Sequence, residues 1–242
     1  MDHLRIYNTL DSTNKEAQRL LAGGPVENGT SLLAKEQTEG RGQLGRKWFA
    51  DSGSHLAMSI ILVPHSLPVS ELPLIGMKTS LGITRALHQL DSSLVPQIKW
   101  PNDIYLNGKK LCGILIENAL SGNTIQHIII GIGMNVNERI FPEEIPNAVS
   151  LYMITGEQND LYQIAQLVRH HVIESVDTPD LYWKQEYDEL LYAKNEEREF
   201  LYEGNTIQGK ILGVDEQGRI LLGFGGGLTR SFYSHEIKWL MP

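Results

Sequence analysis

The sequence predicts an α+β fold, in which helices flank a mixed sheet and a small β-rich module follows. Up to about residue 193, short apolar runs alternate with longer segments whose apolar residues recur at spacings of three and four, the period of an amphipathic helix. After residue 195, short apolar runs are separated by turn-forming clusters such as Gly204-Asn205 and residues 225–227. We therefore expect a main domain at residues 1–193 and a small C-terminal β domain, an SH3-like barrel, at residues 194–242.

The composition is that of a globular protein with one large domain and room for a small appendage. The 242 residues are 41% hydrophobic and 21% charged, and no apolar run approaches the length needed to span a bilayer. A net charge of -8 disfavours general DNA binding, which needs basic surface. No signal peptide is readable and Cys112 is the single cysteine, so we expect a cytoplasmic protein. The patterns H-E-x-x-H and C-x-x-C are absent, so no dedicated metal site is expected.

The first 90 residues predict three strands and two helices. Strands are expected at residues 4–10, 30–35 and 55–63. Thr13 and Glu16 have the spacing of a capping box, which predicts a helix that ends before Pro25. A run of leucines, isoleucine and methionine at helical spacing predicts a long amphipathic helix over residues 70–90. The segment at residues 38–48 is therefore expected to be a loop that joins two strands.

The rest of the main domain predicts a hairpin, a central strand and two helices. The Asn107-Gly108 step between apolar runs is a strong hairpin signal. Residues 125–130 are rich in isoleucine, which predicts a strand buried on both faces, ending in a Gly/Asn-rich bend at residues 131–137. A helix is expected from Asp160, and after Pro179 a second helix is expected to carry Trp183, Tyr187, Leu190 and Leu191.

A basic, glycine-rich segment occupies residues 38–48 and reads T-E-G-R-G-Q-L-G-R-K-W. Glycine permits close approach of the backbone to a ligand, and arginine offers a rigid, charged fork that matches phosphate or carboxylate. Such a loop can fold over an anionic ligand, although a solvated turn has the same composition.

A second informative segment occupies residues 99–117 and reads K-W-P-N-D-I-Y-L-N-G-K-K-L-C-G-I-L-I-E. Asp103 and Lys110 lie on opposite sides of the predicted hairpin turn, so pairing of the two strands can bring their side chains together. A lysine suits a phosphate or a developing oxyanion, and the aspartate could orient that lysine or hold magnesium. A surface hairpin with solvated charges is the alternative interpretation.

Together these segments resemble the biotin protein ligase family (biotin-[acetyl-CoA-carboxylase] ligase). The resemblance rests on D-S-T-N at residues 11–14, Q-T-E-G-R-G-Q-L-G-R-K-W at 37–48, K-W-P-N-D with K-K-L-C-G-I-L-I-E, and G-I-G-M-N-V-N at 131–137. It implies a class II synthetase-like catalytic domain. It also implies formation of biotinyl-5'-AMP from biotin and MgATP, and transfer of biotin to a lysine of a biotin carboxyl carrier domain.

The resemblance assigns roles to individual residues. The residues expected to be catalytic are Lys110, Arg41 and Asp103. The residues expected to contact biotin are Ser12, Thr13, Asn14, Gln37, Gly40, Arg41, Gly42, Gln43, Lys110 and Gly113. The residues expected to contact ATP or the adenylate are Arg41, Arg46, Trp48, Asn102, Lys110 and Asn135. Magnesium is expected to arrive with ATP rather than at a site of its own.

Two positions depart from the family's usual pattern. The loop commonly reads R-G-R-x-G-R, and Gln43 occupies the position of its middle arginine. His235 replaces a glycine often found near the final strand. The negative charge and the short N-terminus favour a monofunctional ligase, with no DNA or membrane partner, over a ligase-repressor, and the family leaves a homodimer open.

Two other functions are compatible with the same residues. An acyltransferase of the lipoate/octanoate group could use Cys112 as its nucleophile, but apolar neighbours favour a buried, inert thiol. A non-catalytic biotin sensor would bind biotin without forming an adenylate, and the presence of Asp103 and Lys110 disfavours it.

Overall fold

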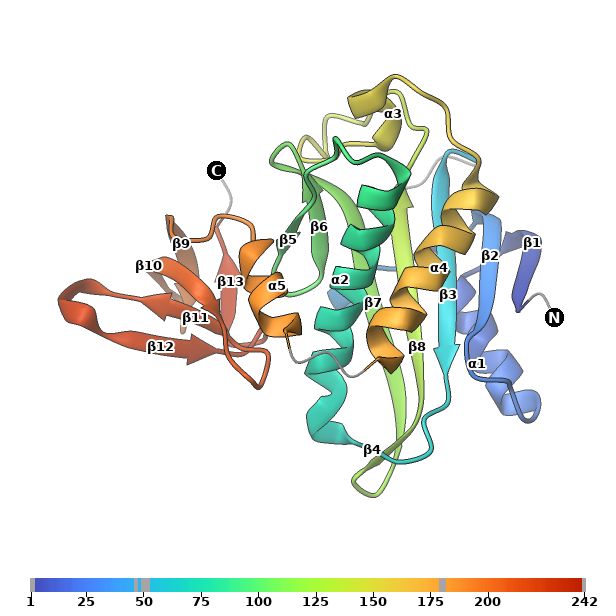
Figure 1. Ribbon diagram of the computed structural model, residues 1–242, viewed down its shortest axis with the longest axis horizontal. Helices are drawn as coiled ribbons and strands as arrows, with labels where there is room; N and C mark the ends of the chain where they lie inside the picture. The colour runs from blue at the N-terminus through green and yellow to red at the C-terminus, as the bar shows by residue number, and fades with distance from the viewer. Residues whose placement is uncertain (1–2, 46–47, 49–52, 179–181, 241–242) are drawn as a thin grey trace.

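The computed structural model describes residues 3–45, 48, 53–178 and 182–240 of the chain. Within these residues it confirms the α+β prediction, with a mixed eight-stranded sheet, helices on both of its faces and a five-stranded sheet at the C-terminal end (Figure 1). No helix in this part of the chain is long and apolar enough to cross a membrane.

The large sheet has the strand order β1-β2-β3-β8-β7-β6-β5. Strands β1 and β2 are parallel and the other neighbours are antiparallel, which makes the sheet mixed. The bounds are β1 Leu4–Leu10, β2 Thr30–Gln37, β3 His55–Leu62, β5 Gln97–Lys99, β6 Asp103–Leu106, β7 Lys109–Ser121 and β8 Thr124–Asn135, and the short β4, Leu67–Pro68, pairs with β8. The hairpin prediction is confirmed, since Asn107 and Gly108 both have positive φ and join β6 to β7.

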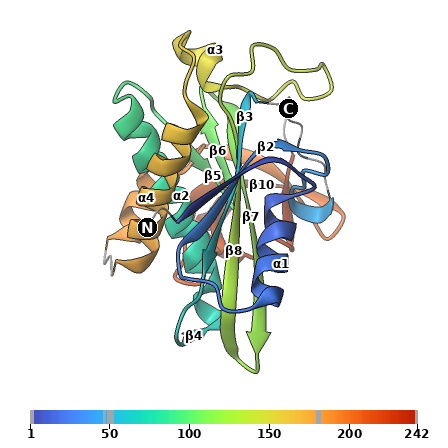
Figure 2. The same cartoon turned by 90° about the vertical axis from the view of Figure 1, so that its right-hand side faces the viewer.

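The two faces of this sheet are covered unequally (Figure 2). Helix α1, Thr13–Gly23, lies on one face, and helices α2, Leu72–Leu90, and α4, Leu161–Asp177, lie on the other. The apolar cluster under α1 is small and centres on Ala17 and Ile129, whereas the cluster under α2 and α4 extends to the C-terminal domain. Part of the α1 face is therefore left for polar side chains. The remaining elements are α3 Leu151–Thr155, α5 Trp183–Glu189, and the 3-10 turns η1 Gln43–Gly45, η2 Val69–Glu71 and η3 Gly225–Gly227.

Helices α2 and α4 approach each other closely at Gly82. A Cβ at this position would lie 2.6 Å from the Cα of Val172 and 2.7 Å from the carbonyl oxygen of His171, and both atoms belong to the α4 backbone. Gly82→Ala is therefore expected to lower the free energy of unfolding by about 1–3 kcal/mol, because the helices must separate. Chemical denaturation measures this change. Gly76→Ala is the matched control, since its Cβ would meet nothing closer than 3.6 Å, and equal stability of both variants would contradict the close packing.

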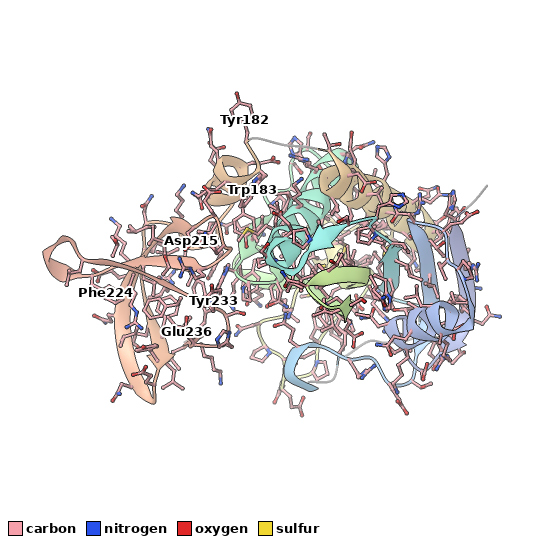
Figure 3. All side chains as sticks on the ribbon, turned by 90° about the horizontal axis from the view of Figure 1, so that it is seen from below. Tyr182, Trp183, Asp215, Phe224, Tyr233 and Glu236 are labelled. Carbon is pink, nitrogen blue, oxygen red and sulfur yellow. The ribbon has the colours of Figure 1, made fainter. Side chains whose placement is uncertain are left out.

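The C-terminal residues form a second, antiparallel sheet of order β12-β11-β10-β9-β13, as predicted for the small β domain. Its strands are β9 Glu197–Tyr202, β10 Asn205–Val214, β11 Ile220–Gly223, β12 Thr229–Phe232 and β13 Ile237–Trp239. The indole nitrogen of Trp239 donates to the carbonyl oxygen of Trp100 at 3.0 Å, and that of Trp100 donates to the carbonyl oxygen of Gly218 at 2.9 Å. Seen from below, Tyr233 also lies where the two domains meet (Figure 3). We propose the boundary at residues 193/194, next to Ala193 and Asn195, whose φ angles are 58° and 65°.

Two local predictions are wrong, and both errors concern residues near the α1 face. The N-cap of α1 is Ser12, and neither it nor Thr13 forms a capping box, because the backbone N–H of Thr13 donates instead to Oε1 of Gln37 at 2.7 Å. The expected bend after residue 130 is also absent up to Asn135, since β8 continues to that residue and pairs with β3 and β7. The backbone there is satisfied by two antiparallel neighbours, which outweighs the turn preference of glycine and asparagine.

The helical predictions are confirmed except at their ends. The helix expected from Asp160 begins at Leu161, and the Asp160 carboxylate accepts from the N–H of Tyr162. The next helix ends at Glu189, so Leu190 and Leu191 lie beyond it, where the backbone around residue 191 pairs with β5 through Ile98. Helix α3 is too short for its apolar period to be read from the sequence.

Candidate functional site

A pocket opens on the α1 face of the large sheet, between the N-terminal end of α1 and strands β3, β7 and β8. Most residues expected to bind ligand line it, namely Ser12, Thr13, Asn14, Gln37, Arg41, Gly42, Gln43, Trp48, Asn102, Lys110 and Gly113. The sequence interpretation missed six lining residues, which are Met58, Ile114, Leu115, Gly131, Ile132 and Gly133. Segments separated by about a hundred residues in sequence therefore converge on one cavity.

Three expected site residues in the described part of the chain do not line this pocket. Asp103 and Gly40 each contact a residue that does, while Asn135 is buried with its Nδ2 3.4 Å from the carbonyl oxygen of Lys110. Arg46 lies outside the described residues.

Three glycines form the floor of the pocket. Gly113 on β7 and Gly133 on β8 are directly paired, and the indole of Trp48 lies over both. A Cβ at Gly133 would lie 2.7 Å from Cε2 of Trp48, and one at Gly113 would lie 2.9 Å from Cζ3. Gly131 supports Asn14 in the same way, since a Cβ there would be 2.5 Å from Oδ1 of Asn14. A Cβ at any of these positions would collide with the side chain of Trp48 or Asn14, so the floor requires glycine.

The Trp48 indole also carries a polar group that has no partner among the described residues. Its Nε1 is buried, and no described residue accepts a hydrogen bond from it. A buried donor of this kind costs about 1–3 kcal/mol unless it is satisfied, so a ligand acceptor at this position would be stabilising. The ring is 5.4 Å from the ammonium nitrogen of Lys110, which places an aromatic face and a cation side by side.

One wall of the pocket is a chain of hydroxyl and amide groups. Oγ of Ser59 lies 2.8 Å from Oγ1 of Thr13 and 2.6 Å from Oδ1 of Asn14. Oε1 of Gln37 accepts from the backbone N–H of Thr13 at 2.7 Å and lies 3.2 Å from the hydroxyl oxygen of Thr13. Ser59 is fully buried, and Thr13 and Asn14 are 4% exposed, so these polar groups are held in fixed positions away from water. This wall can pair with a ligand that has donors and acceptors on one compact ring.

A lysine and an aspartate face each other beside the floor. Nζ of Lys110 lies 2.7 Å from Oδ1 of Asp103, as the hairpin predicts. Strand pairing places Asp103 opposite Gly113 rather than opposite Lys110. A register shift between Ile104 and Tyr105 allows the Lys110 side chain to extend to the Asp103 carboxylate. The backbone of Lys110 is held on both sides, since its N–H donates to Asn147 and its carbonyl accepts from Val149. The ammonium group is therefore directed toward the pocket by its carboxylate partner and by its own backbone.

The basic loop contributes Arg41, Gly42 and Gln43 to the pocket. The N–H of Trp48 donates to the carbonyl oxygen of Gly40 at 3.0 Å, which closes the base of the loop. Gln43 begins the 3-10 turn η1, and it also lines a neighbouring groove that extends to the C-terminal domain. The loop thus stands between the pocket and the junction of the domains.

The two asparagines expected to contact adenylate have structural partners. Asn102 donates through Nδ2 to the carbonyl oxygen of Ile114 and accepts from the N–H of Ile114 at its own carbonyl. Nδ2 of the buried Asn135 donates to the carbonyl oxygen of Val149 at 3.1 Å. Asn102 still reaches the pocket, whereas the adenylate contact of Asn135 stays a prediction.

Profile comparisons match two family models to this chain. Residues 6–135 match the model described as the biotin/lipoate A/B protein ligase family, and residues 199–237 match the biotin protein ligase C terminal domain. The first match includes every residue assigned to the site, and the second falls within the small β domain.

Comparisons with individual proteins and with a solved structure indicate the same family. The bifunctional ligase/repressor of Bacillus subtilis is 32% identical over 247 aligned positions, which cover 98% of this chain and 74% of that protein. The biotin-[acetyl-CoA-carboxylase] ligase of Mycobacterium tuberculosis is 28% identical over 228 positions, covering 89% and 81%. The solved biotin protein ligase from Aquifex aeolicus in complex with biotin and ATP has a TM-score of 0.80 and 32% identity, with 98% of each chain covered. The chain therefore belongs to the biotin/lipoate A/B protein ligase family and is a biotin protein ligase.

Proposed function

We propose that this protein activates biotin as biotinyl-5'-AMP and transfers it to a specific lysine of a biotin carboxyl carrier domain. One observation supports the proposal most strongly. The Lys110–Asp103 pair and Arg41 lie at the same pocket as the fixed polar wall and the glycine floor. Relatives that share its fold and at least 30% of its sequence include a ligase solved with biotin and ATP.

In the first step, a carboxylate oxygen of biotin attacks the α-phosphorus of ATP. The bond to the bridging oxygen of the β-phosphate breaks, and pyrophosphate leaves with the electron pair. Because this step brings two anions together, cations must be positioned before reaction. Lys110 and Arg41 supply them in the proposal, and Asp103 keeps the lysine directed at the reacting centre.

The remaining pocket residues divide between the two ends of the intermediate. Ser12, Thr13, Asn14 and Gln37 bind the ureido ring of biotin in the proposal, and the backbone of residues 40–43 and Gly113 contact the same substrate. Trp48, Asn102, Asn135 and Arg46 are assigned to the adenylate side. Magnesium enters with ATP. A His170–His171–Glu174 cluster lies on α4, which packs on the opposite face of the sheet, so it cannot serve a nucleotide in this pocket.

In the second step, the neutral amine of the carrier lysine attacks the acyl carbon of the intermediate. The bond between that carbon and the phosphate oxygen breaks, AMP leaves, and the amine loses a proton as the amide forms. The intermediate is a mixed anhydride that water would destroy, so the loop at residues 40–47 protects it by covering the pocket in this proposal.

Mass spectrometry of a biotin carboxyl carrier domain tests the function. After incubation with the protein, biotin and MgATP, the carrier should gain one biotin mass, and it should gain none when ATP is omitted. A carrier that stays unmodified, or that is modified without ATP, would overturn the proposal.

The thiol of Cys112 has no role in this chemistry. It is fully buried on β7, and burial raises the pKa of the thiol far above its usual value, so the reactive thiolate is not formed near neutral pH. Cys112→Ala is expected to keep ligase activity within about threefold, and a thiol reagent should label the native protein slowly. Loss of acyl transfer in this variant, with folding intact, would instead support a cysteine-dependent acyltransferase.

Gln43 leaves the loop one cation short of the usual family pattern, at a position that lines the pocket. Gln43→Arg is expected to slow release of biotinyl-adenylate by about 2- to 5-fold, the effect of one partly solvated ion pair. Trapping experiments with the carrier withheld measure the release rate. Gln43→Met keeps the length without the charge and should match the native protein, and a release rate unchanged in Gln43→Arg would show that the charge is dispensable.

A further inference from the structure

Glu117 lies behind the polar wall and does not line the pocket itself. Its Oε2 accepts from Nδ2 of Asn14 at 2.7 Å, which joins β7 to the first turn of α1. Asn14 is also held from two other strands, by Ser59 on β3 and by the close backbone of Gly131 on β8. The amide of Asn14 is therefore fixed by three neighbouring strands, and Glu117 is the charged member of this set.

A carboxylate accepts hydrogen bonds and donates none, so it determines which way the Asn14 amide points. The NH₂ group faces Glu117, and Oδ1 faces Oγ of Ser59 at 2.6 Å. Ser59 donates its one hydroxyl proton to Oδ1 of Asn14. The Thr13 hydroxyl, whose oxygen is 2.8 Å from Oγ of Ser59, must therefore donate to Ser59. The chain of bonds then runs from Thr13 through Ser59 and Asn14 to Glu117.

The direction of this chain decides what the wall offers to a ligand. With the Thr13 proton given to Ser59, the Thr13 oxygen keeps a lone pair as an acceptor. Oε1 of Gln37 faces Thr13 and accepts from its backbone N–H, which leaves the NH₂ group of Gln37 as a donor for a ligand. A ring that carries both N–H donors and a carbonyl acceptor, as a ureido ring does, complements this pattern.

We propose that Glu117 is a positioning residue that sets the donor and acceptor pattern of the biotin-binding wall, and so selects for a cyclic urea. The proposal rests on the proposed function, because it concerns the same pocket. Without the carboxylate, the Asn14 amide is free to rotate by 180°, the Ser59 proton loses its fixed acceptor, and the wall no longer presents one pattern. The nucleotide end of the pocket lies apart from this chain and is unaffected.

Steady-state kinetics of adenylate formation test the proposal. Glu117→Ala should raise the KM for biotin by about 10- to 100-fold, the loss expected for a hydrogen bond to a charged group, with the KM for ATP unchanged. Glu117→Gln should recover most of the affinity, because its amide carbonyl can accept from Asn14. Discrimination between biotin and 2-iminobiotin, in which a protonated imine replaces the urea carbonyl, should decrease in the alanine variant.

The controls distinguish failure of the Glu117 proposal from failure of the proposed ligase function. Asn118→Ala changes an exposed neighbour on the same strand and should leave both KM values unchanged. If the native protein forms no biotinyl-adenylate, the proposed function fails. If the native protein is active but Glu117→Ala leaves the KM for biotin unchanged, or raises both KM values equally, only the role of Glu117 is overturned.

Discussion

Lys110→Ala is expected to lower the rate of biotinyl-adenylate formation by about 100- to 1,000-fold, the range found when a preorganised charge-stabilising donor is removed. Nζ of Lys110 is held 2.7 Å from Asp103 beside the pocket, and no other described lysine lines that pocket. Without it, attack of the biotin carboxylate on the α-phosphate lacks its positioned ammonium group. Pyrophosphate release in the presence of biotin measures the rate.

Lys109→Ala is the matched control for this variant. The two lysines are adjacent on β7, but Lys109 is exposed and does not line the pocket, so its loss should leave the rate unchanged. Removal of Lys110 also leaves the Asp103 carboxylate without its partner, so thermal unfolding must be recorded in parallel. Equal activity of both variants would contradict the assignment of Lys110.

Gly133→Ala is expected to weaken biotin and ATP binding by about 10- to 100-fold, because it places a methyl group in the floor of the pocket. The new Cβ would lie 2.7 Å from the indole of Trp48, and overpacking of this size costs about 1–3 kcal/mol. Isothermal titration of each ligand measures the change.

The control for the floor is Gly76→Ala, which makes the same substitution in α2, where a Cβ meets only ordinary contacts. It should bind both ligands like the native protein. Normal binding by Gly133→Ala would show that Trp48 moves aside at little cost, and that the glycine floor does not limit the site.

Much of the fold and most of the pocket could be predicted from the sequence because their signals are local. The Asn107-Gly108 turn specified the hairpin that brings Asp103 to Lys110, and the order of short motifs indicated which loops share a ligand. The helices at residues 70–90 and after Asp160 were predictable from their apolar period alone.

The features that the sequence did not reveal depend on pairing between distant segments. The sequence predicts a bend at Gly131 and Gly133. Their role in the pocket floor depends on Trp48 and Asn14, which come from distant segments and lie against these glycines in the folded protein. Ser59 and Glu117 sit inside ordinary apolar strands, and only the alignment of β3, β8 and β7 places both next to Asn14. The predicted capping role of Thr13 failed for the same reason, since Gln37 approaches from another strand.

The most direct test of the account is to isolate the intermediate. The protein is incubated with biotin and MgATP but no carrier, freed of unbound nucleotide by rapid gel filtration, and then mixed with a carrier domain without further ATP. The account predicts that denaturing mass spectrometry of the isolated protein detects bound biotinyl-5'-AMP, and that the carrier then gains one biotin mass. Absence of the adenylate, or carrier modification only when ATP is added again, would contradict a two-step ligase built around this pocket.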